Sequence, residues 1–116
     1  MAPKNILVID DNEDLADGLS ELMEMHEHKV DIALNGGDGV TFAETNHYDV
    51  IFVDVGLPDI NGIECARRIR ENGSGARIVL MTGYSAQDIP AHLDDLGETK
   101  LLTKPIDPEL ILAQAD

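Results

Sequence analysis

Two adjacent carboxylates that follow an apolar run are the first residues in this sequence that could do chemistry. The stretch ILVIDD places Asp10 and Asp11 directly after four strongly apolar residues. Burying an ionised carboxylate without a partner costs so much free energy that the group normally takes up a proton instead. We therefore expect a compensating positive charge beside this pair.

Three more polar side chains follow apolar runs: Asp54 after VIFV, Thr82 after IVLM, and Lys104 after the shorter LLT. Three carboxylates, a hydroxyl and an ammonium group form a coherent set if a cation lies among the carboxylates, because mutual repulsion would otherwise raise their pKa values. Mg²⁺ takes oxygen ligands and is commonly held by one or two carboxylates together with a phosphate. We predict a magnesium site at Asp10 and Asp11, with Lys104 paired to a carboxylate while no phosphoryl group is bound.

The apolar runs predict the strands that must position these side chains. Continuous runs rich in β-branched residues are typical of strands buried on both faces, whereas alternating or short runs are typical of edge strands. The five predicted strands are residues 6–9, 30–33, 50–53, 78–81 and 100–102.

A segment with helical spacing of apolar residues follows each predicted strand. The five stripes are Leu15, Leu19 and Leu22; Val40 and Ala43; Ile63, Ala66 and Ile69; Ile89, Leu93 and Leu96; and the segment 107–113. Pro90 requires the fourth helix to begin near it, since proline is tolerated only in a first turn.

This alternation predicts an α/β fold with a doubly wound, five-stranded parallel sheet and helices on both faces, because right-handed crossovers place them there. In such sheets ligands bind at the carboxyl ends of the strands. The candidate residues all lie at those ends.

Composition limits the possible functions. The 116 residues, 43% hydrophobic and 27% charged, suit one globular domain. We expect no membrane contact and a cytoplasmic location, since no apolar run approaches the roughly 20 residues of a membrane helix and the N-terminus lacks a signal peptide.

The single cysteine, Cys65, agrees with a reducing compartment and is expected to be an unreactive helix residue. A net charge of −15 argues against direct nucleic-acid binding.

Four stretches resemble the signature segments of the response-regulator receiver domain of two-component signalling: ILVIDDNED, VIFVDVGLPDINGIE, IVLMTGYS and LLTKPID. They occur in the family's order across almost the whole chain. The resemblance implies the flavodoxin-like strand order 2-1-3-4-5 and a single receiver domain over residues 1–116 whose fifth helix is cut short. The domain is expected to come from a larger protein, either a hybrid histidine kinase or a regulator with an output domain, and MTGYS with TKPID slightly favours the hybrid kinase.

The resemblance also implies a metal site. Asp11 would bind Mg²⁺ directly and Asp10 largely through water. Asp54 would contribute its carboxylate and Gly56 its backbone carbonyl.

The same resemblance implies that Asp54 is the phosphoacceptor. Its carboxylate would attack the phosphohistidine of a histidine kinase or histidine phosphotransfer domain and form an acyl phosphate. Thr82 would hydrogen-bond one phosphoryl oxygen, and Lys104 would neutralise another. Such a domain catalyses its own phosphorylation and dephosphorylation and acts as a signalling switch; its oligomeric state stays open.

The chain departs from the family at the position three residues before the lysine, where Leu101 replaces the usual Tyr or Phe that swings inward on activation. Tyr84 is the nearest ring. The family also predicts a cis peptide bond between Lys104 and Pro105. Two alternatives stay open: a receiver-like module that docks a partner without phosphorylation, and a phosphatase with an aspartate nucleophile. The phosphatase would need a second Asp where Gly56 stands.

Overall fold

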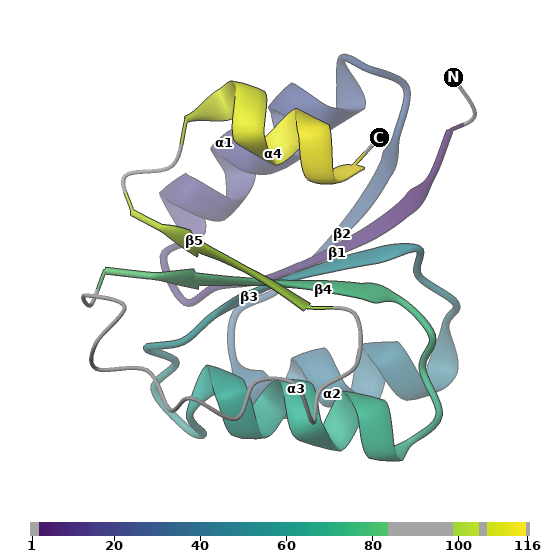
Figure 1. Ribbon diagram of the computed structural model, residues 1–116, viewed down its shortest axis with the longest axis vertical. Coiled ribbons are helices and arrows are strands. Elements are labelled where there is room, and N and C mark those ends of the chain that lie inside the picture. Colours follow the sequence, from purple (N-terminus) through teal and green to yellow (C-terminus); the bar gives the residue numbers. More distant parts are fainter. Residues whose placement is uncertain (1–2, 84–98, 105–106, 116) are drawn as a thin grey trace.

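The structure, a computed structural model, describes residues 3–83, 99–104 and 107–115 (Figure 1). The described ranges contain these elements in chain order: β1 (Asn5–Ile9), α1 (Glu13–Glu24), β2 (Lys29–Ala33), α2 (Gly36–Thr45), β3 (Val50–Asp54), α3 (Gly62–Glu71), β4 (Arg77–Thr82), β5 (Thr99–Thr103) and α4 (Pro108–Ala115).

The five strands form one sheet in the order β2-β1-β3-β4-β5, and every neighbouring pair is parallel. Helices α1 and α4 cover one face of this sheet, and α2 and α3 cover the other (Figure 1). The predicted doubly wound α/β fold and its strand order are therefore confirmed.

Alternate residues of the central strands enter two separate hydrophobic cores. In β1, Leu7 and Ile9 belong to the core beneath α2 and α3, whereas Ile6 and Val8 belong to the core beneath α1 and α4. All four side chains have no exposed surface. A strand buried on both faces is apolar throughout, which explains why an unbroken apolar run predicted it.

Asparagine residues fix where three of the helices begin. Asn12, Asn35 and Asn61 precede α1, α2 and α3, and each side chain accepts a hydrogen bond from a backbone amide in the first turn. Asparagine is among the preferred N-cap residues because it satisfies such an amide. The caps thereby set the start of each helix close to the carboxyl edge of the sheet.

The five strands each lie within one residue of their predicted bounds, and α1, α2 and α3 contain the first three predicted stripes. The helix predicted from Ile89, Leu93 and Leu96 lies outside the described residues, as do Tyr84 and the bond from Lys104 to Pro105. The fifth predicted helix is α4. Over the described ranges, no helix is both long and apolar enough to span a bilayer.

Candidate functional site

The candidate residues meet at the carboxyl edge of the sheet. Asp10 directly follows β1, Asp54 and Thr82 are the last residues of β3 and β4, and Lys104 directly follows β5. Strand register brings these ends together: Asp54 pairs with Met81, the neighbour of Thr82 in β4. The Lys104 amide donates to the carbonyl oxygen of Thr82 at 2.7 Å, so the ends of β4 and β5 are also joined.

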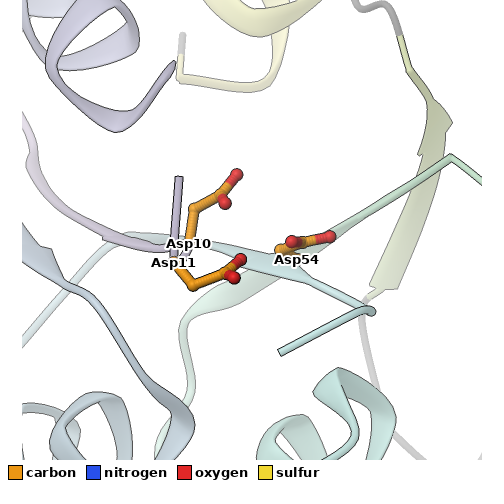
Figure 2. Close-up of side chains that lie close together, drawn as sticks. All are labelled: Asp10, Asp11 and Asp54. Atoms are coloured by element: carbon orange, nitrogen blue, oxygen red, sulfur yellow. The ribbon is translucent and has the colours of Figure 1, made fainter. Parts of the chain in front are cut away.

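Three carboxylates gather at this edge. One carboxylate oxygen each from Asp10, Asp11 and Asp54 lies within 4.8 Å of the other two. Figure 2 shows Asp10 and Asp11 at the end of β1, with Asp54 across from them at the end of β3. Oxygen donors of this kind suit a hard divalent cation such as Mg²⁺ or Ca²⁺. The cluster could therefore hold a metal ion.

The ammonium group of Lys104 lies between two of these carboxylates. Its Nζ is 3.2 Å from Oδ2 of Asp10 and 3.4 Å from Oδ1 of Asp54. The Asp10 side chain has no exposed surface, and that of Asp54 is 11% exposed. Lys104 thus supplies the compensating positive charge that the buried carboxylates require.

Opposing influences act on the pKa of Asp10. Burial is the main influence and raises its pKa above the ordinary value of 3.8, and the nearby charge of Asp54 raises the pKa further. The backbone amide of Asn12, which donates to Oδ1 of Asp10 at 2.9 Å, and the charge of Lys104 act in the opposite direction. A cation among the carboxylates would further favour the ionised form. The residues present therefore fit a bound divalent metal.

The two remaining predicted site residues are Thr82, at the end of the strand beside β3, and Gly56, two residues after Asp54. Thr82 is 1% exposed. Gly56 is exposed, and its amide donates to Oδ1 of Asp54 at 3.2 Å. The structure thus brings every predicted site residue to one edge of the sheet.

Sequence analysis did not single out Asp59, whose carboxylate accepts hydrogen bonds from two backbone amides at the start of α2. These bonds come from Gly36 and Gly37, each at 2.8 Å, and hold the pKa of Asp59 below its usual range. Asp59 is 23 residues from Gly36 in sequence. A pairing between a loop and the first turn of a distant helix has no periodic signature in the sequence.

Cys65 takes no part in this edge. It lies in α3, has no exposed surface, and burial raises its pKa to about 12. A raised pKa disfavours the reactive thiolate. Cys65 is a buried helix residue, as expected, and its lack of reactivity stays a prediction.

Solved structures of similar fold include response regulators. A response regulator from Burkholderia pseudomallei, solved with a phosphorylated aspartic acid, a calcium ion and citrate, is 31% identical, with a TM-score of 0.87 over 97% of this chain and 66% of that one. A CheY-like receiver domain protein from Methanospirillum hungatei is 24% identical and has a TM-score of 0.86 over 97% of this chain and 90% of that one, which shows the fold.

Curated proteins with similar sequences include bacterial regulators. The response regulator ArlR of Staphylococcus saprophyticus is 36% identical over 109 residues, and the transcriptional regulatory protein DltR of Streptococcus agalactiae is 30% identical over the same length. In both cases the alignment covers 94% of this chain and 49% of the relative. The chain therefore spans about half the length of these relatives.

A protein-family match covers the strands and the sheet edge described above. Residues 6–116 match the response regulator receiver domain, a range that includes all of the candidate site residues. This chain belongs to the response regulator receiver domain family, whose members receive phosphoryl groups from histidine kinases in two-component signal transduction.

Proposed function

We propose that Asp54 is the residue of this receiver domain that accepts the phosphoryl group. Its carboxylate ends β3, is slightly exposed, and faces both the other carboxylates and Lys104. An oxygen of Asp54 would form a bond to phosphorus while the bond from phosphorus to the imidazole nitrogen of the donor breaks. The donor histidine keeps that electron pair. The close grouping of Asp54 with two carboxylates and a lysine is the observation that carries this proposal.

The metal ion in this proposal is Mg²⁺. Asp11, the exposed member of the acidic cluster, would bind it directly. Buried Asp10 would act largely through water, and Asp54 and the Gly56 carbonyl would complete the protein's share of the ligands. Mg²⁺ would supply positive charge beside the phosphoryl oxygens during transfer.

Two residues would bind the phosphoryl group once it is on Asp54. The Thr82 hydroxyl would donate to one phosphoryl oxygen, and the Lys104 ammonium group would neutralise another. Phosphoryl transfer through a loose, in-line transition state depends mainly on positioning and on stabilisation of charge. Lys104 already lies 3.4 Å from Asp54 Oδ1, so a small movement would bring it to the new group.

The phosphoryl donor in this proposal is a histidine kinase or a histidine phosphotransfer domain in the cytoplasm. The chain does not itself bind nucleic acid, because its net charge of −15 opposes contact with phosphate backbones. Residues 1–116 act as one receiver domain, and in the protein to which it belongs this domain serves as a phosphorylation switch.

Intact mass spectrometry tests the assignment of Asp54. The chain is incubated with Mg²⁺ and a small phosphodonor, and we expect the mass of one phosphoryl group to be gained. Asp54→Asn should abolish this gain, whereas the matched variant Asp38→Asn, which alters an exposed carboxylate of α2, should retain it. A phosphoryl group that persists on Asp54→Asn would overturn the assignment, and a wild-type chain that gains no mass would favour docking without phosphorylation.

A further inference from the structure

The loop that carries Gly56 connects β3 to α3 over residues 55–61. Its ends are joined because the Gly62 amide donates to the carbonyl oxygen of Val55 at 2.9 Å. Within the loop, Val55 and Leu57 are buried, whereas Gly56 is exposed. The backbone orientation of Gly56 therefore depends on how firmly the rest of the loop is held.

Asp59 ties this loop to α2. Its Oδ1 accepts from the Gly36 amide and its Oδ2 from the Gly37 amide, so both carboxylate oxygens are used. Ile60 reinforces the tie, because its side chain lies so close to Gly36 that a Cβ atom there would overlap it. Two consecutive residues of the loop thus contact the first turn of α2.

Helix α2 is in turn packed against the end of β1. Gly39, in the same helix, lies so close to Ile9 that a Cβ atom at position 39 would overlap the Ile9 side chain. Ile9 is the last residue of β1 and directly precedes Asp10 and Asp11. A chain of contacts therefore runs from the loop through Asp59 and α2 to the strand that carries the aspartate pair.

We propose that Asp59 is a positioning residue for the metal site, which holds the Gly56 loop at a fixed distance from Asp10 and Asp11 through α2. This inference rests on the proposed Mg²⁺ site. Without the tie, the loop would have more conformations to lose when the Gly56 carbonyl binds the metal, and the affinity for Mg²⁺ would fall.

Removing a group that hydrogen-bonds directly to a metal ligand typically lowers metal affinity by roughly 10- to 100-fold. Asp59 acts one step further from the metal, through the loop backbone. We therefore expect Asp59→Ala to weaken Mg²⁺ binding by about three- to tenfold, below that range. Asp59→Asn keeps one acceptor oxygen, so its effect should be intermediate.

Two controls separate positioning from helix stability and from charge. Asn35→Ala removes the other side-chain cap at the start of α2, a 2.8 Å bond to the Asp38 amide, and leaves the loop tied. Asp38→Asn removes a neighbouring exposed charge of α2. We expect Mg²⁺ affinity to stay within about twofold of wild type in both controls. Asn35→Ala leaves the bonds of Asp59 to Gly36 and Gly37 in place, and the charge that Asp38→Asn removes is exposed and screened by salt.

The experiment is a Mg²⁺ titration of each variant, monitored by two-dimensional NMR at the Gly56 and Asp11 amides, with folding stability measured without metal. Support requires Asp59→Ala to lose more affinity than Asn35→Ala at a comparable loss of stability. Equal affinities in these two variants, with wild type binding normally, would overturn this inference alone. A wild-type chain with no saturable response would overturn the proposed metal site and this inference together.

Discussion

Replacing Lys104 with methionine tests the balance of charge at the sheet edge. Lys104→Met removes the ammonium group that lies 3.2 Å from Asp10 and 3.4 Å from Asp54, and it keeps most of the apolar stem. The variant leaves Asp10 fully buried, without its cation and close to a second carboxylate. We expect the metal-free variant to be less stable than wild type at neutral pH.

The size of the loss follows from the geometry. Two unit charges about 3.2 Å apart interact by roughly 5 kcal/mol at an effective dielectric constant of about 20. Breaking a buried ion pair costs about 3–5 kcal/mol, and water that reaches the 24% exposed Lys104 side chain reduces this figure. We expect Lys104→Met to lower the free energy of unfolding by about 2–4 kcal/mol. A loss of about 3 kcal/mol would lower the Tm of a domain of this size by roughly 12 °C.

The loss should depend on pH in a definite direction. Burial raises the pKa of Asp10, and Lys104 opposes that rise, so Lys104→Met should raise the pKa further. A carboxyl group whose pKa is raised by folding contributes stability below its unfolded pKa and loses it as the pH rises through the folded pKa. The deficit relative to wild type should therefore be largest near neutral pH and shrink as the pH falls towards the ordinary carboxyl value of 3.8.

Denaturation in the presence of a chelator, at neutral and at acidic pH, measures this deficit. Lys100→Met is the matched control, since Lys100 lies in the same strand with an exposed side chain, and it should change stability little. Added Mg²⁺ should then raise the Tm of Lys104→Met more than that of wild type, because the metal replaces the missing positive charge. A variant as stable as wild type at neutral pH, or a deficit of equal size at both pH values, would refute the reasoning.

Two further predictions concern the metal and the switch. Asp11→Asn should weaken Mg²⁺ binding by more than about tenfold, whereas Asp14→Asn in the first turn of α1 should change it little; equal weakening in a calorimetric titration would contradict the direct role of Asp11. The phosphoryl mimic beryllofluoride should shift the resonances of Thr82 and Gly83 while Leu101 keeps one rotamer in methyl spectra, and a large Leu101 change with Thr82 unmoved would contradict this.

The fold was predictable from sequence because the central strands are buried on both faces. Their continuous apolar runs end where the first polar side chain appears, and that residue is also the first to reach the edge of the sheet. Asp10 and Asp54 were therefore located by the same pattern that located β1 and β3. The same pattern predicted the edge of the sheet at which these candidate residues meet.

Other features depended on contacts that no local pattern records. Asp10 and Asp11 are adjacent residues of the same type, yet Asp10 has no exposed surface and Asp11 is exposed. The bonds to Asp59 join the loop after β3 to the first turn of α2, which lies more than 20 residues earlier in the chain. Periodicity predicts neither how deeply a side chain is buried nor which residues a loop contacts. Both depend on how the crossover helices pack against the sheet.

The position of Leu101 in β5 indicates where a switch could lie in this domain. Leu101 is partly buried against the core beneath α2 and α3, and it offers neither a ring nor a hydroxyl to a phosphorylated Asp54. A ligand shifts an equilibrium only through a difference in its interactions with the two states. In our proposal the Thr82 hydroxyl and the Lys104 ammonium group would supply this difference. The backbones of these two residues are joined by a 2.7 Å hydrogen bond. A phosphoryl group that draws on both would therefore pull the ends of β4 and β5 as one unit, without a rotamer change at Leu101.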